Sequence, residues 1–489
     1  MEWQVKREIK SLRHLLLGIF GVCGCAAVLA GCGQKDEDTI VLRVSNWEEY
    51  IDQGEWEEDE AIELENGTVI LGENSLVEDF EEWFFETYGK KVVVEYSTFG
   101  TNEELYNQLT MGDSYDLVCP SEYMIMKMIE EGMVVPYSSE FFDGENENNY
   151  YINSVSPYIK DVFDHLAIGD KILSDYAAGY MWGTLGIVYN PEYITEEEAA
   201  HWRLLLNPDI SKRITVKDSV RDAYFAGNSI YNEEFISREE FVNSADYAQR
   251  MAEILNATDE KTVNAVEDVL SNIKDNVYSF ETDSGKADLV TGKVLANQQW
   301  SGDAVYTMDQ AEEEGVYLNY SAPEEATNLW FDGWVMLKVG IDGDKDRQMA
   351  AEAFVNYLSM PENAVRNMYY IGYTSVIAGN SGDAVRQYID WCYGAEDGEE
   401  EVAEYDVTYF FEGADTQTNE EYVIIIPEEQ VRRQLFAQYP TLDVVKRSVV
   451  MAHFDKEGNE RINRMWTNVR CFDIKKWWER LSGSVGGKR

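Results

Sequence analysis

Along the chain, the spacing of apolar residues alternates between that of a strand and that of a helix, which predicts alternating strands and helices. Three short, β-branched runs are typical of strands: VLRVSN (41–46), KVVVEYS (91–97) and YDLVCP (115–120). Three runs with apolar residues at helical spacing predict helices: SLVEDFEEWFFETYG (75–89), TNEELYNQLTMG (101–112) and SEYMIMKMIEEG (121–132). Strand–helix succession with short connections implies right-handed crossovers and a largely parallel sheet, with ligands expected beyond the carboxyl ends of its strands.

The ends of the first two predicted helices carry capping signals. Ser75 and Glu78 form the pattern of a capping box, and Gly89 is placed to end that helix. Thr101 and Glu104 occupy the same two positions at the start of the next helix.

A second α/β region follows a predicted strand at 181–191. Its strand–helix joints lie at 213–227 and 294–308. The chain then returns to the first pattern through a strand (328–339), a helix (347–358) and the segment 360–375. A helix is predicted at 459–470. The acidic, weakly patterned stretch at 393–405 reads as an insertion on the surface, and residues 53–75 separate the first strand from its helix.

The strand at 328–339 places a carboxylate between two tryptophans. Side chains alternate along a strand, so Trp330, Asp332 and Trp334 point to the same face. A buried carboxylate is costly unless a cation or hydrogen bonds compensate it. Two interpretations of Asp332 remain open: a structural arginine or lysine, or a cation supplied by a ligand.

Composition excludes several classes of function. The 489 residues suffice for two or three domains, and an apolar fraction of 45% excludes wholesale disorder. The 92 acidic residues exceed the 40 basic ones, which gives a formal net charge of −52. Such a surface repels nucleic acid and anionic lipid, so we expect no nucleic-acid partner.

The N-terminus predicts export and a lipid anchor. Basic residues precede an apolar run at 15–31 that ends in VLAGC, which resembles a bacterial lipobox. We expect residues 1–31 to be a signal peptide, Cys32 to be lipidated (palmitate included), and 32–39 to be a polar tether. The protein would then be held at the outer face of the cell membrane. A retained transmembrane helix is the alternative.

Motifs for metal, cofactor or nucleophilic chemistry are absent from the sequence. There is no GxSxG, HExxH, P-loop, CxxC or GxGxxG, and the four histidines show no metal-ligand spacing. Beyond Cys32, only Cys119, Cys392 and Cys471 follow, enough for one disulfide at most. We therefore expect no cofactor, no metal and no enzymatic activity. An extracytoplasmic hydrolase with a carboxylate pair stays an alternative, because acidic residues are abundant.

Aromatic and acidic residues gather instead at predicted strand ends. They are Trp47, Tyr50, Tyr123, Trp300, Trp330, Tyr373, Asp218, Asp222 and Asp332. Aromatic faces attract ammonium groups, and carboxylates add charge-assisted hydrogen bonds. This combination suits an organic cation with methylene groups between its charges.

Six fragments occur in the order found in one known family. They are SNWEEYI (45–51), YDLVCPSEYMIMKMIEEGMV (115–134), MWGTLGIVYN (181–190), KDSVRD (217–222), WFD (330–332) and IGYTS (371–375). The chain resembles the spermidine/putrescine-binding proteins of bacterial ABC transporters. The resemblance implies a two-lobed α/β periplasmic-binding-protein fold (type II), each lobe a mixed sheet flanked by helices, with the ligand in the hinge cleft. The lobes would be 40–182 plus 330–380, and 183–329 plus 381–489.

The resemblance also assigns residues to ligand binding. They are Trp47, Glu48, Tyr50, Ser121, Tyr123, Asp218, Ser219, Asp222, Trp300, Trp330, Asp332 and Tyr373. Asp332 matches the carboxylate that holds an ammonium group, and Trp300 and Trp330 match the walls of the methylene channel. Glu48 replaces a small hydroxyl residue, so it would either add a carboxylate for a terminal amine or face solvent.

The residues of KDSVRD match the family less closely. Asp222 matches one of the acids that bind inner amines, whereas the other aligns with Ser219, beside Asp218. The resemblance implies a monomeric, lipid-anchored receptor that delivers putrescine or spermidine to ABC permease subunits. The same fold with another organic cation is an alternative, and the preferred polyamine stays open.

Overall fold

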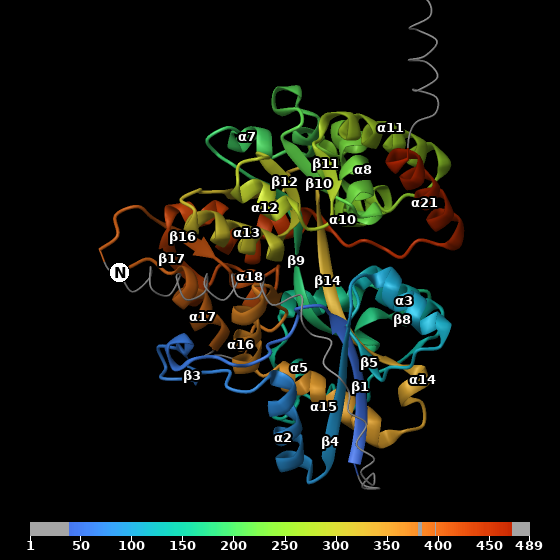
Figure 1. The fold of residues 1–489 in the computed structure, drawn as a ribbon, viewed down its shortest axis with the longest axis vertical. Coiled ribbons are helices and arrows are strands. Elements are labelled where there is room, and N and C mark those ends of the chain that lie inside the picture. The colour runs from blue at the N-terminus through green and yellow to red at the C-terminus, as the bar shows by residue number, and fades with distance from the viewer. Residues whose placement is uncertain (1–38, 380–383, 397, 472–489) are drawn as a thin grey trace, which may run out of the picture. The chain divides into compact units, whose positions relative to one another are not determined.

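The computed structural model describes residues 39–379, 384–396 and 398–471, and it divides into two compact units (Figure 1). Unit 1 contains 39–183 and 330–442, and unit 2 contains 184–329 and 443–471. Strands β9 (Ala177–Tyr189) and β14 (Thr327–Leu337) each contribute residues to both units. The expected signal peptide, Cys32 and nearly all of the expected tether lie outside the described residues.

The sheet of unit 1 has the order β4-β1-β5-β14. Strand β1 (Thr39–Trp47) pairs in parallel with both β4 (Lys91–Phe99) and β5 (Leu117–Val118), as the strand–helix succession predicts. Strand β14 joins the other side of β5 in antiparallel register, with Val335 opposite Val118. The sheet is therefore mixed, and the carboxyl ends of its three parallel strands lie at one edge.

Helices of unit 1 cover this sheet. Helix α2 packs on β4 and α15 packs on β1 (Figure 1). The helices are α2 (Leu76–Tyr88), α3 (Asn102–Met111), α4 (Glu122–Glu130), α5 (Tyr150–Ser154), α6 (Pro157–His165), α14 (Lys338–Ile341), α15 (Lys345–Leu358), α16 (Pro361–Ile371), α17 (Ala384–Tyr393), α18 (Thr408–Glu412) and α19 (Gln434–Gln438). Short strands β6 (Val134–Val135) and β15 (Thr374–Ser375) pair with β14 and β9. Strands β7 (Ala167–Ile168) and β8 (Lys171–Ile172) form a hairpin.

The predicted capping pattern is complete in α2 and half formed in α3. Ser75 accepts a hydrogen bond from the Glu78 backbone, and the Glu78 side chain accepts one in return. Gly89 ends α2 in the left-handed conformation, with φ of 66°. In α3, Thr101 caps the helix as predicted, but the Glu104 side chain accepts from the Gly100 backbone instead (3.0 Å).

Unit 2 is built on a sheet of the order β11-β10-β12-β9. Strands β10 (Ile214–Lys217), β11 (Ser279–Glu281) and β12 (Ala296–Trp300) run parallel, and β9 is antiparallel to β12. Strand β13 (Asn319–Ser321) pairs with β9, and β18 (Ser448–Val449) pairs with β14. Its helices are α7 (Glu196–Ala199), α8 (Val220–Ile236), α9 (Glu239–Val242), α10 (Tyr247–Leu255), α11 (Glu260–Asn276), α12 (Gly285–Val290), α13 (Ser301–Glu313) and α21 (Lys456–Arg470), and α20 (Leu442–Arg447) begins at the boundary.

The core of unit 2 lies between the sheet and three helices. Helix α11 packs against both α8 and α21 (Figure 1). Their apolar side chains meet the strands in one buried cluster, which contains the fully buried Trp202. Trp202 belongs to the 3₁₀ segment Trp202–Leu206, so this segment is fixed to the core.

The structure differs from the sequence-based assignment of residues 381–442 to the second lobe in the part of this stretch that it describes. The structure places 384–396 and 398–442 in unit 1. Trp391 of α17 contacts Tyr369 of α16 at 6.0 Å between ring centroids, and Gln438 donates to the Gly372 carbonyl (3.1 Å). Apolar contacts with α16 thus hold this part of the chain, which sequence patterning alone does not reveal. The chain changes unit for the third time between Leu442 and Asp443.

Both insertions contain regular structure. The acidic stretch forms a hairpin of β16 (Val402–Asp406) and β17 (Val423–Pro427), although its sequence is weakly patterned. The 53–75 insertion contains a second hairpin, β2 (Ile62–Glu63) and β3 (Val69–Ile70). Cys119 and Cys471 form no disulfide bond within the described part. Within the same part, no helix has the length and apolar character needed to cross a membrane.

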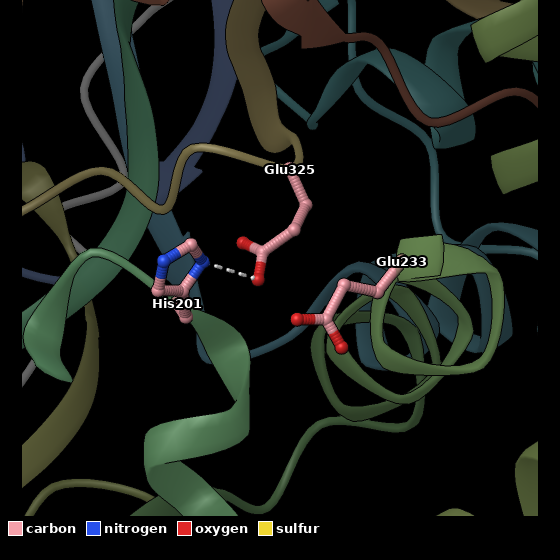
Figure 2. Close-up of side chains that lie close together, drawn as sticks. All are labelled: His201, Glu233 and Glu325. Atoms are coloured by element: carbon pink, nitrogen blue, oxygen red, sulfur yellow. Dashed lines mark hydrogen bonds and ion pairs between the residues drawn. The ribbon is translucent and has the colours of Figure 1, made fainter. Parts of the chain in front are cut away.

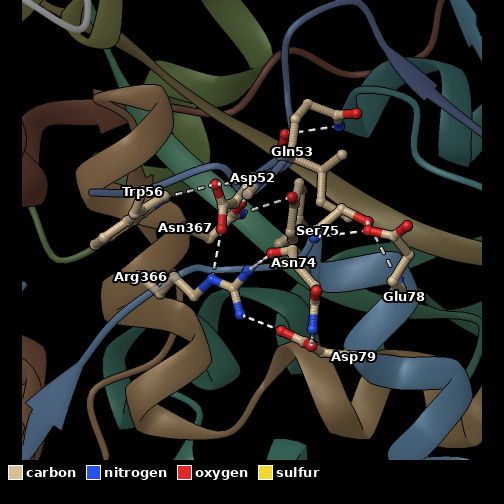
Figure 3. Close-up of polar contacts among 12 residues, drawn as sticks. Asp52, Gln53, Trp56, Asn74, Ser75, Glu78, Asp79, Arg366 and Asn367 are labelled. Carbon is tan, nitrogen blue, oxygen red and sulfur yellow. Dashed lines mark hydrogen bonds and ion pairs between the residues drawn. The ribbon is translucent and has the colours of Figure 1, made fainter. Parts of the chain in front are cut away.

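A buried ion-pair network attaches the first insertion to α16 (Figure 3). Arg366, whose side chain is 5% exposed, forms ion pairs with the fully buried Asp52 and with Asp79 (2.6 Å). Asp52 also accepts from the Trp56 indole (3.0 Å), and its backbone donates to the Asn367 side chain (2.9 Å). These contacts fix the segment directly after Tyr50, which makes the network relevant to the site below.

Removal of Arg366 should destabilise the protein strongly. The variant Arg366→Met leaves the Asp52 carboxylate buried without its cation, and we expect a loss of about 3–5 kcal/mol in the free energy of unfolding. Urea unfolding measures this loss.

The matched control is Lys90→Met. Lys90 pairs with Asp346, but both side chains are exposed, at 46% and 61%, so the expected change is about 0–1 kcal/mol. Equal losses in the two variants would contradict the structural role of the network.

Candidate functional site

Residues at the parallel strand ends of unit 1 meet around Asp332. Trp47 ends β1, and Tyr50 follows in the next loop. Ser121 is the N-cap of α4, shortly after the end of β5, and Tyr123 lies in the first turn of that helix. Because the carboxyl ends of parallel strands share an edge, these positions converge on β14, where Asp332 lies.

Asp332 is a buried carboxylate held by two hydroxyl groups. Ser121 Oγ donates to Oδ1 at 2.8 Å, and the Tyr50 hydroxyl donates to Oδ2 at 2.9 Å. Only 6% of Asp332 is exposed. Among the described residues, no lysine or arginine forms an ion pair with it, so the structural-cation interpretation lacks a candidate in this part of the chain.

Burial raises the pKa of Asp332 to about 6, from an ordinary value of 3.8. The hydrogen bonds from Ser121 and Tyr50, and the nearby indole of Trp47, favour the ionised form but only partly offset desolvation. A cation beside the carboxylate would lower this pKa again. At neutral pH most of this group is therefore ionised despite the cost of burial, so it gains from a positive partner.

Aromatic rings surround this carboxylate. The Tyr373 ring lies edge-on to Tyr50 (5.1 Å between centroids) and to Trp330 (5.9 Å). The buried Trp330 Nε1 has no hydrogen-bond partner in the described structure. Trp47 packs on Phe99 at 4.8 Å. This is an apolar, π-rich environment for a cation with methylene groups.

Three residues that sequence reasoning missed support the set. Asn102 donates to Ser121 Oγ (3.1 Å) and to the Tyr123 hydroxyl (3.0 Å), and it accepts from the Ser121 backbone. The Tyr180 hydroxyl donates to the Tyr50 carbonyl (2.6 Å) and accepts from Asn367 (2.7 Å). Asn102 follows the cap Thr101 directly, a weak signal, but nothing in the sequence marks Tyr180 or Asn367.

Glu48 differs from the rest of the predicted set. It is exposed in the turn after β1. No hydrogen bond joins it to the other candidate residues within the described structure, so it faces solvent rather than the Asp332 cluster.

Unit 2 brings together its own predicted residues at the ends of β10 and β12. Ser219 caps α8 by accepting from the Asp222 backbone (3.3 Å). Asp222 is 5% exposed, and burial raises its pKa, whereas Ser219, the Trp300 indole and the charges of Lys217 and Arg221 lower it. The structure thus brings Ser219, Asp222 and Trp300 together.

A lysine that the prediction omits lies among these residues. Lys217 Nζ sits 4.5 Å from the centre of the Trp300 ring and forms an ion pair with Asp303 at 2.9 Å. Its side chain is 2% exposed. Asp218 is likewise paired, with Arg470 at 2.6 Å. Both acids of this segment therefore already have a cation nearby, in contrast to Asp332.

The family comparison identifies the kind of protein. Residues 75–385 match the model of the bacterial extracellular solute-binding proteins. The chain belongs to this family. Its members are binding proteins, which is consistent with the absence of catalytic motifs from the sequence.

Several curated relatives bind polyamines. The spermidine/putrescine-binding periplasmic protein of Salmonella typhimurium is 26% identical over 363 residues, covering 74% of this chain and 83% of the relative. The putrescine-binding periplasmic protein SpuD of Pseudomonas aeruginosa is 27% identical over 346 residues, covering 69% and 78%.

Solved structures confirm the fold. The spermidine/putrescine ABC transporter substrate-binding protein PotD of Streptococcus pneumoniae, in complex with calcium and HEPES, aligns with a TM-score of 0.55 and 24% identity over 88% of this chain and 98% of that one. The Tp0655 (TpPotD) lipoprotein of Treponema pallidum aligns with a TM-score of 0.56 and 16% identity, covering 88% and 99%. The predicted mixed α/β fold of the two-lobed periplasmic-binding-protein type is correct.

Because the pKa of Asp332 is raised, the difference in stability between the parent protein and the variant Asp332→Asn should depend on pH. The folded state holds the proton more tightly than the unfolded state, so this carboxyl group's stabilising contribution falls as pH rises from about 4 to about 6 and is absent above that range. The variant Asp332→Asn, measured without ligand, should exceed the parent in stability at pH 8 by up to about 3 kcal/mol.

Urea unfolding of both proteins at pH 8 and pH 4 measures the effect, because other titrating groups cancel in the difference. The difference should shrink towards pH 4. A difference independent of pH would show that the carboxyl group does not titrate in this range.

Proposed function

We propose that this solute-binding protein binds a polyamine, putrescine or spermidine, and delivers it to the permease of an ABC importer. The observation that carries the proposal is Asp332, a buried carboxylate with hydroxyl donors and no cation among the described residues. The polyamine specificity of the curated relatives supports this choice of ligand.

An ammonium group suits the environment of Asp332. It would supply the missing positive charge and form a charge-assisted hydrogen bond with the carboxylate. The rings of Trp330 and Tyr373 add cation–π attraction of about 0.5–2 kcal/mol, and they also accept methylene groups. A neutral solute would leave the ionised carboxylate uncompensated.

Within unit 2, the residues at the ends of β10 and β12 are proposed as contacts for an amine group. Asp222 is the acid best suited to an amine there, because Arg470 already neutralises Asp218. Lys217 lies against the Trp300 ring, so a ligand could contact only the rest of that indole. Asp222 is therefore a weaker candidate than Asp332 for the charge partner of an amine.

Replacement of Asp332 should abolish high-affinity binding. Calorimetric titration of the chain from residue 33 with putrescine, spermidine and spermine should show one-to-one binding of at least one polyamine. The variant Asp332→Asn should weaken it by at least about 30-fold, since a charge-assisted contact of about 2 kcal/mol or more is lost.

The control variant is Asp342→Asn, because Asp342 is an exposed carboxylate in the same unit. Its affinity should equal that of the parent. Lysine and betaine serve as control ligands, and a preference for either over all polyamines would shift the proposal to another organic cation. Unchanged polyamine affinity in Asp332→Asn would refute the site.

We also propose that Cys32 carries a lipid that anchors the exported protein to the outer face of the membrane. The support is the VLAGC sequence after a basic and apolar N-terminal segment. In cells expressing the full chain, the protein should fractionate with membranes, and Cys32→Ser should release it or leave it unprocessed. Cys471→Ser is the control, because Cys471 is exposed and free. Identical fractionation together with identical signal-peptide processing in all three proteins would contradict the anchor.

A further inference from the structure

Three metal-ligating side chains from separate segments of unit 2 meet in space, and none belongs to the proposed polyamine site. His201 immediately precedes the 3₁₀ segment Trp202–Leu206, Glu233 lies in α8, and Glu325 lies just before β14 (Figure 2). One potential ligand atom from each lies within 4.8 Å of the other two. The positions of these three residues in the sequence do not predict that they lie together.

Glu325 is a buried carboxylate with one oxygen unsatisfied. Its side chain is 2% exposed, and Oε1 lies 2.9 Å from His201 Nδ1. Oε2 is buried and has no hydrogen-bond partner in the described structure. The nearby Arg447 donates to the Ala322 carbonyl (2.9 Å) rather than to this carboxylate. Buried carboxylate oxygens without a partner are rare, so the site favours an additional cation.

Figure 2 shows the Glu325 carboxylate between the His201 imidazole and the Glu233 carboxylate. Glu233 is positioned by an ion pair between one of its oxygens and Arg203. Its other oxygen forms no hydrogen bond with a described residue. The arrangement therefore offers an imidazole nitrogen and two carboxylates that can bind a metal ion.

The backbone around the cluster is already held in place. The Glu324 backbone donates to the Ala200 carbonyl (2.7 Å), and the Trp202 indole donates to the Ala326 carbonyl (2.8 Å). Trp202 is fully buried in the core of unit 2. These bonds hold the segments carrying His201 and Glu325 side by side, so the site needs little ordering upon binding.

We propose that His201, Glu233 and Glu325 bind a divalent transition-metal ion of the zinc type. Imidazole nitrogen with carboxylate oxygens is a common zinc donor set, with three protein ligands leaving a fourth position for water. Two carboxylates balance the charge of the ion. The side chains of His201 and Glu233 are 40% and 20% exposed, which gives the ion a path from solvent.

Zinc chloride titration of the purified protein against a chromogenic chelator tests the proposal. The expected result is one zinc ion per chain. Co²⁺ should give the visible spectrum of a low-coordinate site. Loss of a ligand in His201→Ala, Glu325→Gln or Glu233→Gln should weaken binding by more than the roughly 10–100-fold typical of outer-shell changes.

The matched control is His165→Ala. His165 is an exposed histidine close to a carboxylate, Asp161 at 3.4 Å, but it belongs to no such cluster. Zinc affinity should be unchanged in this variant. Absence of stoichiometric zinc binding, or equal affinity in the parent and all three ligand variants, would overturn the proposal.

Polyamine titration of the same variants separates this site from the proposed function. Each correctly folded ligand variant should retain the parent's polyamine affinity, whether or not zinc is bound. Glu233→Gln alters a partly exposed residue, so it keeps the test valid if Glu325→Gln is unstable. Failure of polyamine binding in every protein would refute the proposed function and leave the zinc result independent.

Discussion

The uncompensated carboxylate of Asp332 is the constraint on which the account of this protein depends. Burial makes its ionised form costly, and two hydroxyl groups offset only part of that cost. A protein that retains such a group in its core gives up stability in the ligand-free state. A cationic ligand would recover this free energy on binding, which links the structure of unit 1 to the family's role in solute capture.

The surrounding structure holds the carboxylate's donors in place. Asn102 fixes Ser121, and Tyr180 with Asn367 fixes the loop of Tyr50. Farther out, the Arg366 network anchors the segment that follows Tyr50. The donors are therefore oriented by contacts that span α3, α16 and β9, so the site depends on the fold of the whole unit.

Local sequence signals predicted the fold well where an element depends on residues that are close together in the sequence. The capping residues of α2, the parallel β1–β4–β5 arrangement and the strand carrying Asp332 all follow from patterning. The same signals did not predict packing between segments that are far apart in the sequence. The placement of residues 384–442 in unit 1 depends on contacts of α17 with α16, and the hairpin β16–β17 forms in an acidic stretch without clear alternation.

The candidate site shows the same limit. Strand-end reasoning, with the family resemblance, found Tyr50, Ser121 and Asp332, which lie together, but it included Glu48, which is exposed. It missed Lys217 and the cluster around His201, because both depend on residues far apart in the chain.

The most direct test of the central claim is the carboxyl pKa of Asp332 itself. NMR titration of the protein with ¹³C-labelled aspartate, using Asp332→Asn for assignment, should give a pKa near 6 without ligand. Saturation with the bound polyamine should lower it towards or below 3.8, because the ammonium stabilises the ionised form. A pKa that stays unchanged on saturation would show that the ligand's charge is not placed beside this carboxylate.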